Sequence, residues 1–563
     1  MIEIVFNHAD FEYDVYGLVQ AFFPREELET VYDVPEDEAG NLPYQSRNRR
    51  IQMMKEQESR FAGKKAEKEN SGDQGQEEEE QKKDSDDKTP TRLTVTYQAG
   101  QVELDWIPGE DRSGIGAEKT QENGSEAAPE GRMRRILAYP SGWPADPAHD
   151  PAVRPEMKNL LKRGVYDLLS DLTGKQLPWG TLTGIRPTKV PLRMIEEGKS
   201  DAEIESFMKT AYETSDEKIQ TAEQIAHREH EILSSIDTEK GLSIYIGIPF
   251  CPTTCLYCSF PSYARASFEG QVDSYLTALE KEIGAAAEIM RDKEKHLDTV
   301  YIGGGTPTSL SAAELDRLLS AIDRELPMPV REFTVEAGRP DSIDRDKLRV
   351  MKAHGVSRIS INPQTMQDKT LKLIGRHHTT AQLIEAFRLA REEGFSDINM
   401  DLILGLPGET TEDVRSTLDQ VKALGPDNLT IHSLAIKAKS RLNKEWEAYQ
   451  NYAMENSDAL MQMAMETAES MGLQPYYLYR QKHMIGNLEN IGFAGPGKAG
   501  IYNILIMEEK ETILALGAGT ASKYVWDKGR NVKRTENVRD IPTYIERIDE
   551  MIQRKKDAAD KWL

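Results

Sequence analysis

Residues 244–258 read IYIGIPFCPTTCLYC, a short apolar run that leads directly into three closely spaced cysteines. The run is rich in β-branched and aromatic residues, which predicts a buried strand, and Cys251, Cys255 and Cys258 follow it in a C-x3-C-x2-C loop. Three thiolates this close together can ligate three irons of a [4Fe-4S] cubane and leave the fourth iron open to another ligand. The spacing favours an iron–sulfur site. A zinc site, which prefers four Cys or His ligands, and three inert thiols stay open as alternatives.

Cysteine count and charge restrict the compartment and the partners. No other cysteine occurs among the 563 residues, and an odd number without a distant partner excludes a conventional disulfide framework. The amino terminus has no basic segment followed by an apolar one, and no run of about 18 uncharged apolar residues occurs. We therefore expect a cytoplasmic protein with reduced thiols and no membrane span. The formal net charge of -24 argues against nucleic acid as the main partner, because phosphate binding needs a surplus of Lys and Arg.

From residue 243 onward, short apolar runs alternate with helical patterns, which is typical of repeated βα units around a parallel sheet. The six candidate strands are Ile244–Ile248, Thr299–Gly303, Phe333–Glu336, Arg358–Asn362, Ile398–Ile403 and Leu429–Leu434. These units predict an α/β fold built on a partial (β/α)6 barrel of the TIM type. Because the chemistry of such barrels lies at the carboxyl ends of the strands, the residues just after each run are the candidates for a site.

Composition divides the chain into four segments. Residues 1–175 predict a small α+β domain, interrupted near 56–91 and 108–131 by polar inserts with too few apolar residues to become ordered. The other segments are a helical connector (176–241), the barrel (242–443) and a carboxyl-terminal α/β extension (444–563) with strands expected at 476–479, 502–507 and 512–516.

The C-x3-C-x-Tyr-C loop behind a strand resembles the signature of the radical S-adenosylmethionine (SAM) superfamily, and the resemblance extends over about residues 242–525. It implies that Cys251, Cys255 and Cys258 hold a catalytic [4Fe-4S] cluster, that SAM binds the open iron, and that SAM is cleaved to a 5′-deoxyadenosyl radical. It also implies SAM contacts from residues that flank the cysteines or follow later strands: Tyr245, Tyr257, Gly304, Gly305, Thr306, Glu336, Gln364, Arg376 and Asp401.

Several of the implied contacts have a plainer alternative. The triple-glycine turn lets its backbone approach a ligand, or it is only a tight bend. Glu336 suits an ammonium group or ribose hydroxyls, or it is a solvated acid at a strand end. Arg376 matches a carboxylate bidentately, whereas Asp401 faces the cofactor region or is a buried structural acid. The lone histidines His432 and His483 are expected to be structural.

Other motifs resemble one subgroup, which contains oxygen-independent coproporphyrinogen III dehydrogenase and a related haem chaperone. Phe260 stands where the dehydrogenase has a further cysteine, as it does in the chaperone branch. The haem-binding motif of the chaperone, however, is replaced by Tyr502–Met507, which contains neither His nor Trp. The stretches Leu182–Lys189 and Gly486–Phe493 are similar to the HemZ branch of dehydrogenase-like proteins.

The resemblance implies oxidative decarboxylation of two propionates of coproporphyrinogen III to the vinyl groups of protoporphyrinogen IX, with an electron donor such as flavodoxin or ferredoxin. A tetra-anionic porphyrinogen needs cations, and Arg186, Lys189 and Arg193 are candidates; a solvated helix start is their alternative. Two other functions stay open. One is a haem-binding delivery protein that retains a cluster, and the other is a radical SAM enzyme, such as a methylase, for another substrate.

Overall fold

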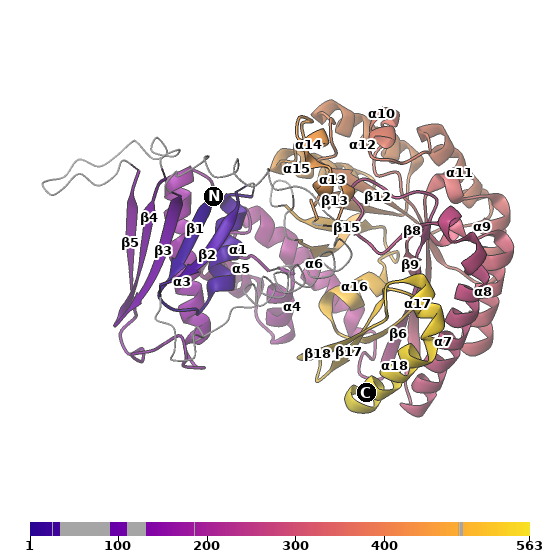
Figure 1. Ribbon diagram of the computed structural model, residues 1–563, viewed down its shortest axis with the longest axis horizontal. Helices are drawn as coiled ribbons and strands as arrows, with labels where there is room; N and C mark the ends of the chain where they lie inside the picture. The colour runs from indigo at the N-terminus through magenta and orange to yellow at the C-terminus, as the bar shows by residue number, and fades with distance from the viewer. Residues whose placement is uncertain are drawn as a thin grey trace, which may run out of the picture. The chain divides into compact units, whose positions relative to one another are not determined.

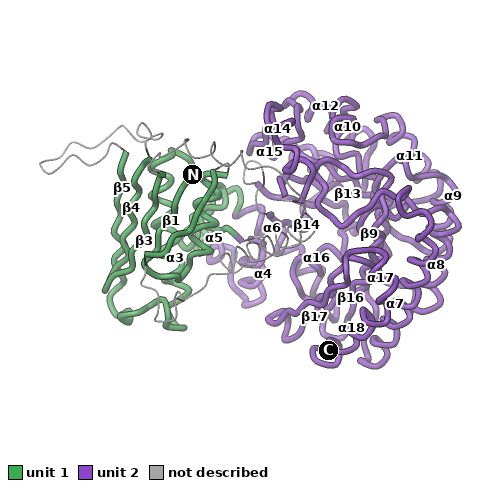
Figure 2. The backbone as a smooth tube through the Cα atoms, in the orientation of Figure 1, with its two compact units in different colours: residues 1–183, 205–218 green, residues 184–204, 219–563 purple. Residues whose placement is uncertain are grey.

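The structure is a computed structural model, and it describes residues 1–24, 26–33, 90–109, 131–184, 186–437, 439–481, 484 and 488–563. The polar inserts expected near 56–91 and 108–131 lie almost entirely outside these residues, and so does His483. Two compact units are present (Figure 2): residues 1–183 with 205–218, and residues 184–204 with 219–563. Among the described helices, none combines the length and the apolar character needed to cross a membrane.

The amino-terminal unit is a five-stranded sheet with two helices packed on it (Figure 1). Its elements are β1 (Ile2–Phe6), α1 (Glu12–Phe22), β2 (Leu28–Tyr32), β3 (Thr91–Gln98), β4 (Gln101–Ile107), β5 (Met133–Ala138) and α3 (Arg154–Thr173). The strand order is β2-β1-β3-β4-β5. Strand β1 is parallel to both of its neighbours, and β4 is antiparallel to both β3 and β5. Alternate residues of β1 are buried against α1 and α3, as the alternation of its sequence requires. The expected α+β fold of this segment is confirmed.

Three helices follow: α4 (Lys189–Glu196), α5 (Asp201–Tyr212) and α6 (Asp216–Ser234). Helix α4 and most of α6 already belong to the larger unit, whose centre is one continuous sheet. Its six central strands are β6 (Gly241–Ile248), β9 (His296–Gly304), β10 (Glu332–Gly338), β11 (Arg358–Ile361), β12 (Ile398–Leu404) and β13 (Asn428–Ser433). They are neighbours in chain order and all parallel, so the predicted (β/α)6 partial barrel is confirmed.

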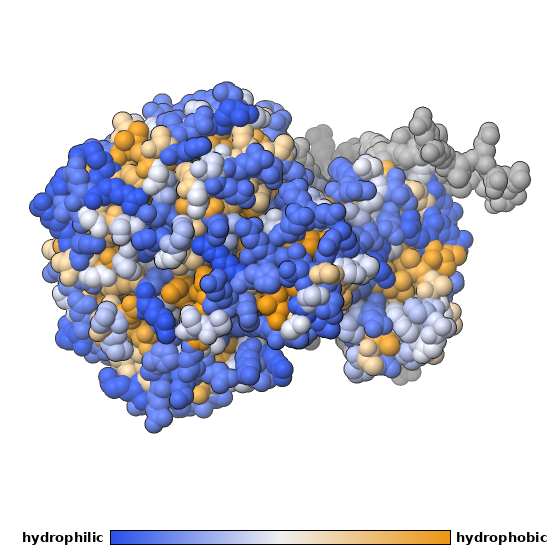
Figure 3. Space-filling view, turned by 180° about the vertical axis from the view of Figure 1, so that it is seen from behind, coloured by the Kyte–Doolittle hydropathy of each residue, from blue (hydrophilic) through white to orange (hydrophobic). Residues whose placement is uncertain are grey.

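Helices on the outside of the barrel connect these strands (Figure 1). They are α7 (Val272–Asp292), α8 (Ala312–Glu325), α9 (Arg345–Ala353), α10 (Asp368–Leu373), α11 (Thr380–Glu392) and α12 (Thr411–Leu424). Three of them begin at capping boxes, in which a Ser or Thr and an acidic or amide side chain three residues later satisfy each other's backbone amides: Ser311 with Glu314, Thr379 with Gln382, and Thr410 with Asp413. The face drawn in Figure 3 is mainly hydrophilic, with apolar side chains in scattered groups, as expected when the apolar residues fill the core.

Residues after the barrel extend both edges of its sheet. The remaining elements are α13 (Arg441–Lys444), α14 (Trp446–Tyr449), α15 (Asp458–Ser470), β14 (Gln474–Tyr479), β15 (Asn490–Ala494), α16 (Ile501–Glu508), β16 (Thr512–Leu516), β17 (Ala521–Trp526), β18 (Asn531–Glu536), α17 (Ile541–Glu546) and α18 (Ile548–Trp562). Strand β16 pairs parallel with β6, and β15 pairs antiparallel with β13. The sheet therefore continues past the six predicted units at each side.

The prediction of a strand over residues 502–507 is wrong, because this segment lies in helix α16. The segment contains Ile and Tyr residues that favour strands, but a residue distant in the chain contacts the amino terminus of the helix. Glu332 in β10 is a buried acid whose carboxylate accepts the backbone amide of Ile501, where the helix begins. This carboxylate satisfies an orphan donor and suits the positive end of the helix dipole.

Candidate functional site

A cavity of about 380 Å³ lies at the carboxyl ends of the barrel strands, where the sequence predicts the site. Eleven of the twelve predicted site residues line it, and Tyr245 is the exception. The volume lies within the range of about 300–1,000 Å³ that is typical of small-molecule sites. The parallel strands thus bring together residues that are separated by up to about 150 positions in the chain.

The three cysteines lie on one wall of this cavity. Cys251 follows β6 in the short strand β7 (Phe250–Cys251) and is buried, whereas Cys255 and Cys258 are half-buried. Two backbone hydrogen bonds, from Leu256 to Ile374 and from Leu442 to Leu256, fix the loop to the barrel. Burial raises the pKa of Cys251 to about 11 and also raises the pKa of Cys258. The raised pKa values favour the protonated thiols of Cys251 and Cys258 in the absence of a cation, and a coordinated metal deprotonates its thiol ligands.

The spacing of the three sulfurs bears on the zinc alternative. Ligands of a single ion gather around it, and zinc–sulfur bonds are about 2.3 Å long. Within the described residues, the group of three ligand side chains that lie within 4.8 Å of one another is elsewhere, and the three cysteines do not meet that spacing. This wider arrangement suits a cluster in which each thiolate binds an iron of its own.

The turn after β9 packs on the cysteine loop. The amides of Gly305 and Thr306 each donate a 2.7 Å hydrogen bond, to the carbonyls of Ile248 and Phe250. A Cβ on Gly305 would lie 2.5 Å from the Phe250 carbonyl oxygen. Contact with protein backbone alone thus requires a glycine at this position, and close approach of a ligand to the turn stays a prediction. The same packing places Thr306 Oγ1 3.5 Å from Cys251 Sγ.

Glu336 lies at the end of β10 among tyrosines. Its Oε1 accepts a 2.7 Å hydrogen bond from the Tyr301 hydroxyl. The Tyr301 ring stacks on Tyr502 at 4.4 Å and on Tyr245 at 6.0 Å between centroids. Tyr245 therefore supports the cavity wall from behind Tyr301, and sequence reasoning missed Tyr301 although it lies on a predicted strand. Burial, together with the charge of Asp401, raises the pKa of Glu336 to about 7.

This pKa predicts a pH-dependent stability. The ordinary pKa of Glu is 4.5, so between about pH 4.5 and 7 the folded protein binds the proton more tightly than the unfolded chain does. The stability that this protonation contributes is lost as the pH rises through that window. We expect cluster-free Glu336→Gln protein to gain stability relative to the unmodified protein from about pH 5 to about pH 8, by on the order of 3 kcal/mol. Denaturant unfolding across this range measures the difference, and a difference that does not change with pH would contradict the assignment.

Tyr257, Gln364 and Arg376 form a hydrogen-bonded chain beside the cysteines. The Tyr257 hydroxyl donates to Gln364 Oε1 at 2.8 Å and accepts from Arg376 Nη1 at 3.2 Å. Gln364 holds a left-handed backbone conformation with φ of 66°, and its amide bonds to the Asp401 carbonyl. Arg376 Nε is buried without a hydrogen-bond partner among the described residues, as is Asn362 Oδ1 on the same wall. These two unpaired atoms, one donor and one acceptor, can form hydrogen bonds with a polar ligand in the cavity.

Asp401 and His432 form the opposite part of the wall, on β12 and β13. Asp401 Oδ1 accepts a 2.8 Å hydrogen bond from Asn399, and Oδ2 lies 3.9 Å from His432 Nε2. Although burial opposes ionisation, His432 and Asn399 hold the pKa of Asp401 below its ordinary value. Sequence reasoning assigned His432 no role beyond structure. The sequence does place His432 near the end of the sixth predicted strand, where residues of a site are expected.

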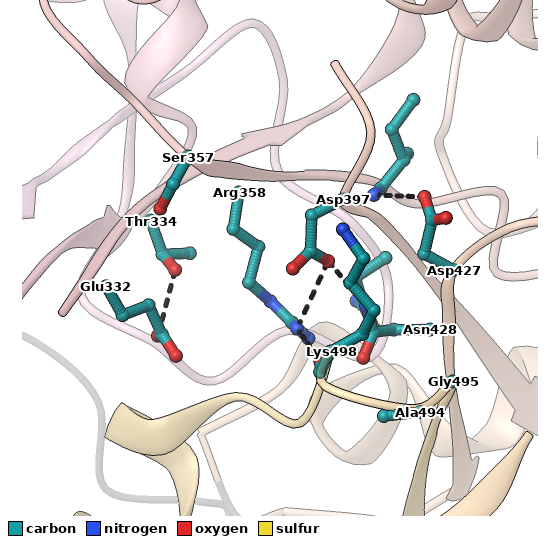
Figure 4. A network of polar contacts seen from close by, with 12 residues as sticks. Glu332, Thr334, Ser357, Arg358, Asp397, Asp427, Asn428, Ala494, Gly495 and Lys498 are labelled. Carbon is teal, nitrogen blue, oxygen red and sulfur yellow. Dashed lines mark hydrogen bonds and ion pairs between the residues drawn. The ribbon is translucent and has the colours of Figure 1, made fainter.

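Four Lys and Arg side chains line the cavity, and three of them form ion pairs or hydrogen bonds with other protein groups. Arg339 pairs with Asp341 at 2.6 Å, and Arg376 donates to backbone carbonyls. Arg358 is enclosed in the network of Figure 4, where it donates to the Lys498 carbonyl at 2.8 Å and lies 3.4 Å from Asp397. Lys437 follows β13 and has no acidic partner among the described residues; its Nζ lies 5.5 Å from the centre of the Phe260 ring.

The cations that the sequence suggested for substrate binding lie elsewhere. Arg186 donates to Glu509 at 3.1 Å, Lys189 lies 3.1 Å from the same carboxylate, and Arg193 is exposed beside Glu197. None of the three lines the cavity of the described chain. Arg186 and Lys189 instead share the carboxylate of Glu509, which is more than 300 residues away in the chain and also lies near Lys523 and Arg534.

Comparisons with known proteins agree with this geometry. Residues 245–421 match the model of the Radical SAM superfamily. The chain is 41% identical to the oxygen-independent coproporphyrinogen-III oxidase-like protein HemZ of Bacillus subtilis, over 71% of this chain and 80% of that protein. This chain is a HemZ-like member of the radical SAM superfamily. It is also 33% identical to the heme chaperone HemW of Bacillus subtilis, over 55% of this chain and 76% of that protein.

Among solved structures, coproporphyrinogen III oxidase (HemN) from Escherichia coli aligns with 57% of this chain and 73% of its own, at 24% identity and a TM-score of 0.45. Membership of the radical SAM superfamily implies a [4Fe-4S] cluster and SAM. The residues present fit both groups. One buried and two half-buried thiols can hold the cluster, and a cavity of small-molecule size with unpaired polar atoms can hold SAM.

Proposed function

We propose that this protein is a radical SAM enzyme that oxidatively decarboxylates coproporphyrinogen III to protoporphyrinogen IX. The observation that carries the proposal is the single cavity wall on which the three cysteines, the Tyr257–Gln364–Arg376 chain and the unpaired Lys437 meet. The relative HemZ is itself named only as oxidase-like, so the substrate rests on the chemistry of this cavity.

In this proposal Cys251, Cys255 and Cys258 hold the cluster, and Arg376 and Glu336 bind the charged ends of SAM. When bound, the cluster and SAM would supply a 5′-deoxyadenosyl radical that takes a hydrogen atom from a propionate side chain; the resulting propionate radical would lose CO2 and pass one electron to an external one-electron acceptor, which leaves the vinyl group. The Arg376 guanidinium, fixed by Tyr257 and two backbone carbonyls, presents its free Nε to a carboxylate. Tyr301 holds Glu336 in one orientation, and the stacked rings behind it exclude water from that side.

Lys437 is the proposed contact for a substrate propionate. It lies beside the cysteine loop, where Cys258 is close enough to affect its pKa, and burial lowers that pKa. A half-buried ammonium without a carboxylate partner among the described residues gains from an anionic ligand. The cation therefore draws a propionate toward the cluster without competing with Arg376 for SAM.

The activity is tested with anaerobically reconstituted protein, coproporphyrinogen III, SAM and a reductant such as reduced flavodoxin. We expect 5′-deoxyadenosine together with loss of two carboxyl groups from the porphyrinogen. 5′-Deoxyadenosine without a vinyl product would contradict the substrate assignment, and S-adenosylhomocysteine would indicate methylation instead.

Lys437→Gln gives a sharper test of the substrate contact. We expect the KM for coproporphyrinogen III to rise by about 10-fold or more, as for loss of a charge-assisted hydrogen bond, while SAM cleavage without substrate is unchanged. Lys439→Gln, an exposed lysine of the same loop outside the cavity, is the matched control. Equal KM values for the two variants would remove Lys437 from the proposal.

Haem delivery is the second candidate, and two observations favour it. Several relatives are named heme chaperones, and the cavity wall carries an imidazole, His432, within the described chain. Stoichiometric haem binding that His432→Ala abolishes, together with no turnover of coproporphyrinogen III, would favour delivery over the proposed enzyme.

A further inference from the structure

Three ligand-type side chains of the amino-terminal unit take no part in the proposed function. His8 and Asp10 lie in the loop between β1 and α1, and His149 lies in the turn that precedes α3. One ligand atom from each lies within 4.8 Å of the other two, a spacing that this group alone reaches among the described His, Cys, Asp and Glu side chains. All three residues belong to the same compact unit.

The Asp10 carboxylate is the centre of the group. Its side chain is only 10% exposed, and its Oδ1 accepts a 3.0 Å hydrogen bond from Arg154. Oδ2 is buried and has no hydrogen-bond donor among the described residues. Because an unpartnered buried carboxylate oxygen costs free energy, a ligand at Oδ2 would stabilise this loop.

His8 approaches that same oxygen without forming a hydrogen bond. Its Nδ1 lies 2.7 Å from Asp10 Oδ2, yet both atoms are buried and neither has a hydrogen-bond partner in the described chain. An ordinary pair in this protein looks different: His227 Nε2 meets Asp201 Oδ1 at 2.8 Å as a hydrogen bond, with both side chains at least half exposed. The contact is an ion pair whose geometry does not fit a hydrogen bond, and a cation can take the place of the proton between these two atoms.

His149 has the arrangement of a histidine ligand. Its Nδ1 lies 2.9 Å from Asp146 Oδ2, and its Nε2 lies 3.5 Å from Asp10 Oδ2. Histidines that bind metals usually donate the other ring N–H to a carboxylate, which fixes the tautomer and leaves the remaining nitrogen free to coordinate. Asp146 is placed to do this for His149.

The loop that carries the first two ligands is held firmly to the sheet. The Asn7 side chain donates to the Tyr97 carbonyl and accepts from the Tyr97 amide on β3, at 2.9 and 2.8 Å. The Tyr97 hydroxyl donates to the Asp10 carbonyl at 2.6 Å, and the His8 ring packs edge-on against Tyr97. These contacts fix the positions of His8 and Asp10 before any ion arrives.

We propose that His8 Nδ1, Asp10 Oδ2 and His149 Nε2 bind one divalent transition-metal ion of the zinc class. Two imidazoles and one carboxylate suit such an ion, and a three-ligand site leaves a coordination position for water. Ligand atoms around tetrahedral zinc lie about 3.4 Å apart. The two imidazoles are 44% and 42% exposed, so the His8 ring can turn outward and the His149 ring can adjust slightly to reach this spacing. The ion would join the loop before α1 to the turn before α3.

Zinc binding by the full chain tests the site, in a background that carries C251S, C255S and C258S so that the cysteine loop binds no metal. Competition with a chromophoric chelator should give one equivalent of zinc per chain. H8A and H149A, both at half-exposed positions, should each abolish that equivalent with unchanged circular dichroism. D146N should weaken zinc binding by about 10- to 100-fold, because it removes only the orienting carboxylate.

H227A is the matched control, since it removes an exposed His–Asp pair that lacks a third ligand, and it should leave the zinc equivalent unchanged. Cobalt replacement gives a second readout: a visible d–d spectrum that H149A eliminates. Absence of zinc binding in the cysteine-free chain, or binding that H8A and H149A leave unchanged, would overturn the proposal. Neither outcome depends on the porphyrinogen assay, because these proteins contain no cluster.

Discussion

Cys255→Ala protein is expected to contain no [4Fe-4S] cluster after anaerobic reconstitution and to form no 5′-deoxyadenosine from SAM. Cys251→Ala and Cys258→Ala should behave in the same way, because in the proposed site each of the three thiols binds one iron. The loss should exceed about 1,000-fold, since no other cysteine in the chain can take the place of the missing ligand. Visible absorbance, iron and sulfide content, and chromatography of the nucleoside product measure it.

Thr254→Ala is the control for this series. Thr254 is an exposed residue between the first two cysteines and does not line the cavity, so its replacement should leave cluster content and SAM cleavage close to those of the unmodified protein. If any single cysteine variant keeps SAM cleavage, the assignment of that cysteine as a ligand is wrong.

Gly305→Ala is expected to have the second largest effect, although Gly305 donates no side chain to the site. The new methyl carbon would lie 2.5 Å from the Phe250 carbonyl oxygen and 2.9 Å from that of Ile248. Both neighbours are backbone atoms, so the strand that leads into Cys251 must move. Overpacking of this kind costs about 1–3 kcal/mol, and displacement of a reacting group by about 1 Å can cost about 100-fold in rate. The rate of 5′-deoxyadenosine formation and the thermal unfolding midpoint measure the two effects.

Gly270→Ala separates this mechanism from a general effect of replacing glycine. A Cβ at Gly270 would meet no atom within 4 Å, so its cluster content, rate and unfolding midpoint should match those of the unmodified protein. Equal behaviour of the two alanine variants would show that the contact between the turn and the cysteine loop does not position Cys251.

The cysteine site could be predicted from the sequence because its information is local. Cys251, Cys255 and Cys258 lie within eight residues, and the strand before them is marked by its own apolar run. Glu336, Gln364 and Asp401 could also be placed, since the carboxyl ends of parallel strands meet at one edge of a sheet. Each of these residues lies in or directly after a predicted strand.

Features that depend on distant partners could not be predicted. The amino terminus of the helix over residues 501–508 is capped by the carboxylate of Glu332, about 170 residues earlier. The pairing of Arg186 and Lys189 with Glu509 spans more than 300 residues, so their charges looked available in the sequence. Lys437 is distinguished from other lysines only by its place in the cavity and by the lack of an acidic partner there among the described residues.

Electron paramagnetic resonance of the reduced, reconstituted protein with and without SAM tests the central claim most directly. If the three thiols hold a cubane with one open iron, the protein contains about four irons and four sulfides per chain, and SAM changes the spectrum of the reduced cluster because it binds that iron. A spectrum that SAM leaves unchanged, or a metal content dominated by zinc, would contradict the account.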